Sequence, residues 1–184
     1  MRSILIGVGA NLPIANNKPR KTCGAALFEL EKKGIQIVKR SSWYYSAPVP
    51  KSKQPWYVNA VVALKTALAP EILLDTLLLV ENEFGRCRGK QNAARVLDLD
   101  ILSYDNLTKT MYSPARNTLI LPHPELMNRA FALIPIRDIA PNWQHPTNKL
   151  SVNELIEQLP PGQSINKAID APGFFGTEFF GNSI

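Results

Sequence analysis

The chain has 184 residues, of which 45% are apolar and 20% are charged, a balance that excludes a disordered or fibrous protein and indicates one soluble globular domain. Its formal charge of +6 favours anionic partners, and nucleic acid, a membrane surface and a polyphosphate all fit that charge. No run of residues approaches the roughly 20 apolar positions of a membrane span. Cys23 and Cys87 have neither metal-ligand spacing nor the density of a disulfide framework, so we expect a reduced, cytoplasmic protein.

Hydrophobic periodicity predicts four strands and two long helices in the first part of the chain. In order, we expect a strand over Ser3–Val8, a helix over Lys21–Lys33, a strand over Ile35–Tyr45 broken near Ser41, a strand over Tyr57–Ala67, a helix from Ala69 to Phe84, and a strand from Leu97 to Tyr104. Gly34 and Gly85 follow the two helices, as is typical of a helix end. This order predicts an α/β fold, a ferredoxin-like sandwich with a mainly antiparallel sheet and flanking helices.

The remaining segments are shorter or irregular. The proline-rich and lysine-rich stretch 47–56 predicts an exposed loop, residues 118–121 predict one arm of a hairpin, and short helices are expected around 126–139 and 152–158. We expect residues 1–170 to form a single domain. Residues 171–184, rich in Gly and Phe, are expected to be a tail without a catalytic role, either loose or covering an apolar patch.

Two aspartates alternate with apolar residues in the last long strand. If Leu97–Ile101 is a strand, Asp98 and Asp100 leave it on one face, with Cα atoms about 6.5 to 7 Å apart, while the leucines face the core. That spacing suits two carboxylates converging on a divalent cation or a metal pair. On the pattern alone, a polar strand face turned to water is the favoured interpretation.

Several arginines lie close to this pair in the sequence. Arg86 and Arg88 follow the second long helix, and Arg95 stands three residues before Asp98. Phosphoryl transfer uses such a mixture, because carboxylates hold Mg²⁺ and guanidinium groups neutralise charge on the transferring and leaving groups. Solvated, helix-terminal cations are the alternative. The run Gly7–Leu12 lacks the third glycine of a dinucleotide fingerprint, and no phosphate-binding P-loop sequence is present.

Two further groups of residues suggest a binding pocket. His123 lies between two prolines and is typical of a turn, but with Arg129 nearby it has the chemistry to donate a hydrogen bond to a phosphate. Tyr57 and Asn59 share one strand face, and with Phe131 they would make a site for a flat heterocycle such as a base or pterin. On position alone, the two aromatic residues are more typical of a core.

Taken in order, these motifs resemble the 6-hydroxymethyl-7,8-dihydropterin pyrophosphokinase family. The resemblance covers roughly residues 4–158 and rests on the following segments: Gly7–Leu12, Tyr45–Pro48, Gln54–Ala60, Glu81, Gly85–Arg88, Arg95–Ile101, Pro122–Pro124 and Asn128–Phe131. It implies the Mg-dependent transfer of diphosphate from ATP to the pterin hydroxymethyl group, with release of AMP, in folate biosynthesis. It also implies small-molecule substrates; we expect no nucleic-acid or membrane partner, and a monomer.

The resemblance assigns roles to individual residues. It implies that Asp98 and Asp100 bind two Mg²⁺ ions and act in catalysis with Arg88 and Arg95. The residues implied at ATP are Glu81, Arg88, Arg95, Ile101, His123 and Arg129. Those implied at the pterin are Ser46, Ala47, Pro48, Tyr57, Asn59 and Phe131. No general base is evident from the sequence, and proton acceptance by Asp98 is a hypothesis.

The chain departs from the family pattern at two places. Asn92-Ala93-Ala94 replaces an aromatic-Gly-Pro segment that family members commonly have before the arginine matching Arg95, so a pterin-covering aromatic is absent there. Leu78 occupies a helix position that is often Gln.

Two alternative functions stay open: a divergent relative with another diphosphotransferase or binding role, favoured by the altered loop, and an RNA-binding α/β module, favoured by the positive charge. The aspartates on the sheet face and the missing RNA-recognition signature disfavour the second.

Overall fold

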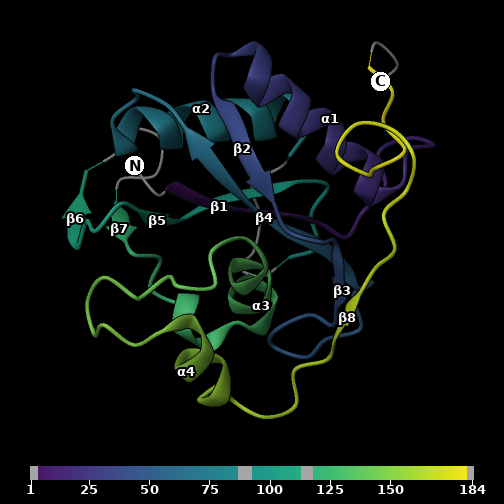
Figure 1. Cartoon of the computed structure of the whole chain (residues 1–184). Coiled ribbons are helices and arrows are strands. Elements are labelled where there is room, and N and C mark those ends of the chain that lie inside the picture. The colour runs from purple at the N-terminus through teal and green to yellow at the C-terminus, as the bar shows by residue number, and fades with distance from the viewer. Residues whose placement is uncertain (1–3, 87–92, 113–117, 182–184) are drawn as a thin grey trace.

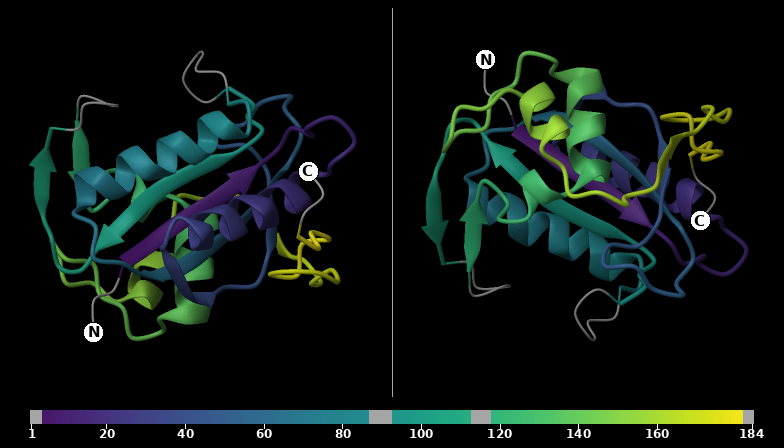
Figure 2. Two further views of the ribbon diagram at one scale, coloured as in Figure 1. Left: turned by 90° about the horizontal axis from the view of Figure 1, so that it is seen from above. Right: turned by 90° about the horizontal axis from the view of Figure 1, so that it is seen from below.

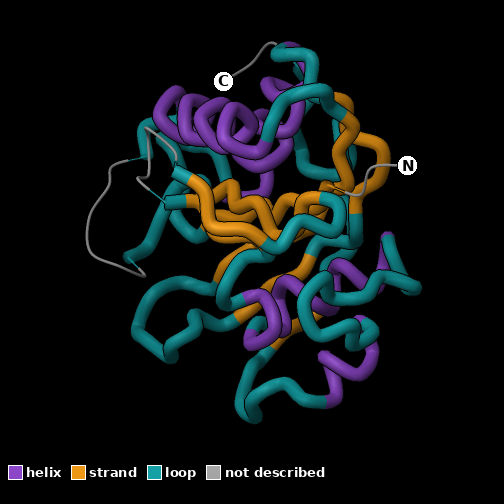
Figure 3. Tube along the Cα trace, turned by 90° about the vertical axis from the view of Figure 1, so that its left-hand side faces the viewer, coloured by secondary structure: helices purple, strands orange, loops and turns teal. Residues whose placement is uncertain are grey.

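The computed structural model describes residues 4–86, 93–112 and 118–181, and within them a six-stranded sheet lies between two layers of helices (Figures 1 and 3). The strands are β1 (Ile4–Ala10), β2 (Gln36–Arg40), β3 (Tyr44–Ser46), β4 (Tyr57–Lys65), β5 (Asp98–Tyr104) and β8 (Ile165–Lys167). Their order is β5-β1-β4-β3-β8, with β2 also on β4, and every pairing is antiparallel. This confirms the expected α/β sandwich.

The helices divide between the two faces of the sheet (Figure 3). The long helices α1 (Pro19–Lys32) and α2 (Pro70–Glu83) cover one face, and α3 (Ala130–Ile139) and α4 (Val152–Glu157) lie on the other, after a 3₁₀ turn at Leu126–Asn128. A separate hairpin joins β6 (Lys109–Met111) to β7 (Leu119–Leu121), as expected for the arm at 118–121.

Local chemistry explains how the element boundaries differ from those expected. α1 begins at Pro19 instead of Lys21, because proline is favoured in the first turn, where its missing N–H is not needed. Gly34 and Gly85 have φ of +79° and +75°, and both follow helix ends as predicted. β2 and β3 pair with the same strand, β4, so the break near Ser41 divides the expected strand into two that lie along one side of β4.

Two apolar cores lie on opposite faces of the sheet. On the α1/α2 side, Leu97, Leu99 and Ile101 join the helices in the larger core and are at most 3% exposed. On the α3/α4 side, Leu5 and Leu102 belong to a second, smaller core. Full burial of one such side chain stabilises the fold by about 1.5–3 kcal/mol, so both layers are held mainly by apolar packing.

The segment after β8 packs against α1, where its yellow coil lies in Figure 2. The ring of Phe28 lies 5.3 Å from that of Phe174 and 5.6 Å from that of Phe179, centroid to centroid. The indole Nε1 of Trp43 donates to the carbonyl oxygen of Phe175 at 2.8 Å. In the described part of this segment, the phenylalanines therefore cover an apolar patch. No helix in the described residues is long and apolar enough to cross a membrane.

Candidate active site

A cleft opens on the α3 side of the sheet, where the starts of β4 and β5 meet the N-terminus of α3. It encloses about 510 Å³, its open mouth included. Its walls are formed by Ser46, Ala47, Pro48, Val49, Pro50, Tyr57, Asn59, Arg95, Asp98, Arg129 and Phe131. The loop after β3 supplies one wall and the start of α3 supplies another. The cleft therefore collects the residues that the sequence predicted at the pterin, together with three that it predicted at metal or phosphate.

Two further hollows continue from this cleft along β5. The second is lined by Gly7, Gly9 and Leu102 and also by Asp98, Asp100, Arg129 and Phe131. The third, of about 480 Å³ with its mouth, is lined by Leu74, Ile101, His123 and again Asp100. Asp98 is thus shared by the first two hollows, and Asp100 by the second and third. The two carboxylates therefore lie where neighbouring hollows adjoin.

Asp98 is held between two arginines. Its Oδ2 accepts a hydrogen bond from Nη1 of Arg95 at 2.9 Å, and its Oδ1 lies 2.7 Å from Nη1 of Arg86. That second contact is an ion pair without hydrogen-bond geometry, so the buried Oδ1 accepts no hydrogen bond from a described residue. Burial raises the pKa of Asp98, and the nearby charge of Asp100 raises it further, while the two arginines oppose the shift.

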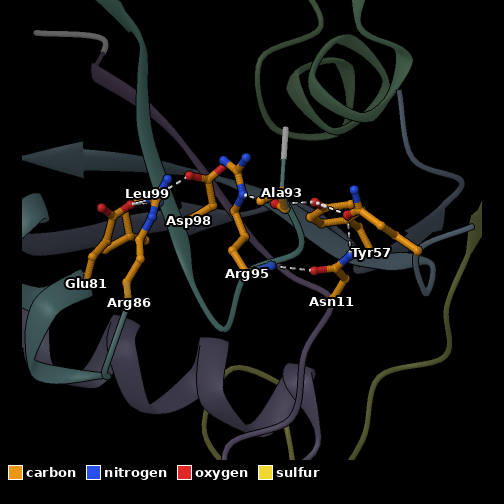
Figure 4. A network of polar contacts seen from close by, with 9 residues as sticks. Asn11, Tyr57, Glu81, Arg86, Ala93, Arg95, Asp98 and Leu99 are labelled. Carbon is orange, nitrogen blue, oxygen red and sulfur yellow. Dashed lines mark hydrogen bonds and ion pairs between the residues drawn. The ribbon is translucent and has the colours of Figure 1, made fainter. Parts of the chain in front are cut away.

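Arg86 extends this contact to a buried glutamate (Figure 4). Glu81, on α2, is 1% exposed and pairs with the Arg86 guanidinium, while its Oε1 accepts from the backbone N–H of Leu99 at 2.7 Å. Burial raises the pKa of Glu81 to about 7, although Arg86 acts in the opposite direction. The glutamate predicted at ATP therefore lies beneath the aspartate strand, where it fixes Arg86 and the start of β5.

The other end of the network fixes Arg95 and Tyr57 (Figure 4). The carbonyl oxygen of Ala93 accepts from Nε of Arg95 at 3.1 Å and from the hydroxyl of Tyr57 at 3.4 Å. Oδ1 of Asn11 accepts from the backbone N–H of Arg95 at 2.8 Å. Burial raises the pKa of the Tyr57 hydroxyl, which keeps it a hydrogen-bond donor. Ala93 lies in the segment that departs from the family pattern. Its carbonyl oxygen thus links Arg95, which the sequence predicted at phosphate, to Tyr57, which forms an aromatic wall of the cleft.

The amide of Asn59 lies across the end of β1 because residue 9 is glycine. Nδ2 of Asn59 donates to Oγ of Ser46 at 2.8 Å, and both side chains are buried. A Cβ at Gly9 would lie 2.6 Å from Oδ1 of Asn59, closer than two such atoms approach in folded proteins. Gly9, which looked like part of a weak dinucleotide motif, is required to leave room for this amide.

The residues from the last part of the predicted site lie around the start of α3 and in the third hollow. The guanidinium carbon of Arg129 lies 5.6 Å from the ring centroid of Phe131, a cation–π contact. Nδ1 of His123 accepts from the N–H of Glu125 at 3.1 Å, which assigns the ring proton of a neutral imidazole to Nε2. Ile101 is 3% exposed and contributes an apolar surface to the hollow.

Comparison with protein families decides which family this chain represents. The model of the 7,8-dihydro-6-hydroxymethylpterin-pyrophosphokinase (HPPK) family matches residues 5–141. The chain belongs to this family. The HPPK family acts in folate biosynthesis, and its enzymes are pyrophosphokinases whose substrate is hydroxymethyldihydropterin.

Named relatives agree with this assignment. The 2-amino-4-hydroxy-6-hydroxymethyldihydropteridine pyrophosphokinase of Synechocystis is 36% identical over 84% of this chain and 75% of its own length. That of Haemophilus influenzae is 36% identical over 86% of this chain and 94% of its own. The folic acid synthesis protein fol1 of Pneumocystis carinii is 35% identical, but this chain spans 20% of it.

Solved structures show the same fold. The wild-type HPPK-DHPS of Plasmodium falciparum with pteroate superimposes with a TM-score of 0.69 at 13% identity, covering 85% of this chain and 44% of that one. The chain thus spans less than half of these longer proteins, so the likeness applies to their HPPK portion and to its fold.

Most of the HPPK site residues predicted from the sequence lie in the three connected hollows. Glu81 lies in the protein interior instead, and Arg88 lies outside the described residues. Leu78, at a position where the family often has Gln, is 2% exposed and packs in the larger core. Sequence reasoning named Arg86 only among the arginines that could neutralise phosphate charge, and it gave no role to Asn11, although both stand in the quoted motifs. Their contacts join segments that are distant along the chain, and no local pattern encodes them.

The carboxylates fit a divalent cation. Two aspartates on one strand face raise each other's energy when both are charged, and a cation between them would relieve that repulsion. Among the described residues, no group of three or more His, Cys, Asp and Glu side chains is placed to hold a metal. The two carboxylates of Asp98 and Asp100 suit Mg²⁺, which is commonly bound through one or two carboxylates with water and substrate phosphates completing its shell.

Proposed function

We propose that this chain transfers diphosphate from ATP to the hydroxymethyl oxygen of 6-hydroxymethyl-7,8-dihydropterin, with two Mg²⁺ ions held by Asp98 and Asp100. The observation that carries the proposal is the position of these carboxylates at the junctions between the three hollows. A group that passes from a nucleotide to a pterin must cross such a junction. Family membership supports the pterin as acceptor.

The first hollow has the chemistry of a pterin site. Tyr57 and Phe131 provide aromatic surfaces from β4 and α3, and aromatic side chains favour offset stacking on a flat heterocycle. The amide of Asn59, oriented by Ser46, and the backbone of the loop at Ala47 and Pro48 are the polar groups proposed to bind the ring edge. Aromatic surfaces combined with a few fixed polar groups are the usual form of a selective small-molecule site.

The second and third hollows are proposed to hold the triphosphate and the rest of the nucleotide. Arg129 borders the first two hollows and His123 the third, so both are placed to donate hydrogen bonds to phosphate oxygens. Arg95 and Arg86 add positive charge beside Asp98. Arg88 keeps its predicted phosphate role on the strength of the sequence. Every group named comes from one chain, so we propose that a monomer is sufficient.

In the proposed reaction, the hydroxymethyl oxygen forms a bond to the β-phosphorus, the bond from that phosphorus to the α-phosphate oxygen breaks, and AMP leaves. When bound, Mg²⁺ supplies Lewis-acid stabilisation of charge on the phosphate oxygens. Asp98, which borders the first hollow, is proposed to accept the hydroxyl proton. Arg95 and Arg129 neutralise the charge of the transferring group and hold it in place.

The test is to mix the protein with Mg²⁺, ATP and the reduced hydroxymethyl pterin and to measure AMP by chromatography. We expect AMP in proportion to the pterin added, and none when the pterin is omitted or EDTA is present. Formation of ADP, or no nucleotide product at all, would contradict the proposal.

A further inference from the structure

The start of α3 carries two proposed site residues and has no cap of its own. Arg129 occupies the N-cap position with extended backbone, φ −120° and ψ 106°, and no side chain within the helix accepts a hydrogen bond from its first N–H groups. A cap needs a side-chain acceptor, usually from Ser, Thr, Asp or Asn, and a guanidinium has donors only. Arginine at position 129 suits phosphate binding, but its side chain cannot cap this helix.

Gln163 supplies the missing contact from a distant part of the chain. Its Oε1 accepts from the backbone N–H of Ala130 at 3.0 Å, and its Nε2 donates to the carbonyl oxygen of Asn128 at 2.9 Å. One amide thus fixes the peptide groups on both sides of Arg129. It also holds the break between the 3₁₀ turn and α3, which places Arg129 and Phe131 on the cleft wall.

The residues next to Gln163 hold the opposite wall of the cleft. The carbonyl oxygen of Ser164 accepts from the N–H of Ala47 at 3.0 Å, and Ile165 pairs with Ser46 where β8 joins β3. β8 lies beside β3 in Figure 1. Segment 163–165 therefore contacts the wall that carries Phe131 and the wall that carries Ser46.

We propose that Gln163 is a positioning residue that sets Arg129 and Phe131 at a fixed distance from the Ser46–Pro48 wall. The inference rests on the proposed function, since the cleft it shapes is the proposed pterin site. The family model matches residues 5–141, and segment 163–165 lies beyond them. The contacts of this segment with the two cleft walls are therefore a feature of this chain outside that match. Gln163 is not among the residues that line the three hollows, and it acts through the peptide groups around Arg129.

The first test is a kinetic comparison of Gln163→Ala and Gln163→Glu with the wild-type enzyme. Because displacing a positioning group by about 1 Å is enough to lose a large factor in rate or affinity, we expect the KM for the pterin to rise about tenfold in Gln163→Ala through the shift of Phe131, and kcat to fall as well through the shift of Arg129. Glu keeps the acceptor for Ala130 but loses the donor to Asn128, so its KM should be intermediate. Gln158→Ala, at the exposed end of α4, is the matched control.

The second test needs no turnover. Hydrogen exchange at the Ala130 amide, followed by NMR in the protein without substrates, should be faster in Gln163→Ala than in the wild type and in Gln158→Ala. Unchanged exchange at Ala130 would overturn the inference. An active Gln163→Ala enzyme with a lower melting temperature and an unchanged KM for the pterin would overturn it as well, because a residue that only stabilises the fold would give that result. A wild-type protein that makes no pterin-dependent AMP would instead overturn the proposed function.

Discussion

Neighbouring residues at the start of β5 and just before it face two very different environments. Leu97, Leu99 and Ile101 point to the α1/α2 side, where they are almost fully buried in apolar packing. Asp98 and Asp100 point to the α3 side, where they border connected hollows. The same strand thus contributes stability on one face and charge on the other. Because side chains alternate across a strand, changes on the two faces should have separable effects.

The largest expected effect is on the polar face. Asp98→Asn and Asp100→Asn should each lower kcat/KM by about 10² to 10³-fold, because each removes a carboxylate proposed to hold the Mg²⁺ that stabilises negative charge on the phosphate oxygens. The free energy of unfolding should change by no more than about 2 kcal/mol, since these side chains contribute little to packing. Steady-state AMP formation and urea unfolding measure the two quantities. A large loss of stability with normal activity would contradict the comparison.

Leu99→Ala should show the opposite pattern. Leu99 is fully buried in the larger core, and truncation of such a leucine costs about 2–5 kcal/mol of unfolding free energy. The backbone N–H that Glu81 accepts from is kept, so kcat per folded molecule should stay close to that of the wild type. Urea unfolding, with activity corrected for the folded fraction, tests this. A stable but inactive variant would show that the two faces are not separable.

Two glycines of β1, Gly9 and Gly7, offer a comparison of two substitutions on the strand next to β5. In Gly9→Ala, the new Cβ would meet Oδ1 of Asn59 at 2.6 Å, so the amide must leave its hydrogen bond with Ser46. We expect the KM for the pterin to rise about tenfold, in line with the loss of a well-placed hydrogen bond. In Gly7→Ala, the nearest atoms are Leu102 carbons at 3.5 Å, an ordinary contact, and the KM should be unchanged. Equal KM values in the two variants would refute the role given to Asn59.

The last comparison concerns Glu81, which lies between the two environments. Burial raises its pKa to about 7, so the native state binds its proton more tightly than the unfolded state does. The protonated side chain contributes stability below its ordinary pKa of about 4.3, and that contribution is lost as the pH rises to about 7. The free energy of unfolding of the wild type relative to Glu81→Gln should therefore fall between pH 4.5 and 7. Urea unfolding across this range measures it, and a constant difference would contradict the pKa shift.

The alternation around Asp98 was enough to predict which residues of β5 face the core, and the order of motifs was enough to predict the fold and the family. The cleft residues Tyr57, Asn59 and Phe131 were also named from their positions in those motifs. Glu81 shows the limit of such reasoning, because the motif gives its residue type but its partners depend on how α2 packs on β5. Local sequence patterns carry no information on that packing.

The features that the sequence did not predict depend on contacts between distant segments of the chain. Arg86 pairs with Asp98, twelve positions further along the chain, and Gln163 caps a helix that starts 33 residues before it. No periodicity or spacing rule links such residues. The sequence also left open whether the Phe-rich end is loose or covers an apolar patch, since that depends on whether α1 presents a complementary surface. Phe28 provides it.

The central claim is that Asp98 and Asp100 hold divalent cations between the two substrates. Mn²⁺ in place of Mg²⁺ gives a direct measurement, because bound and unbound Mn²⁺ are distinguished by electron paramagnetic resonance in the presence of a non-hydrolysable ATP analogue. We predict two Mn²⁺ ions per wild-type chain and a clear loss of binding in both Asp98→Asn and Asp100→Asn. Wild-type stoichiometry and affinity in both variants would contradict the claim.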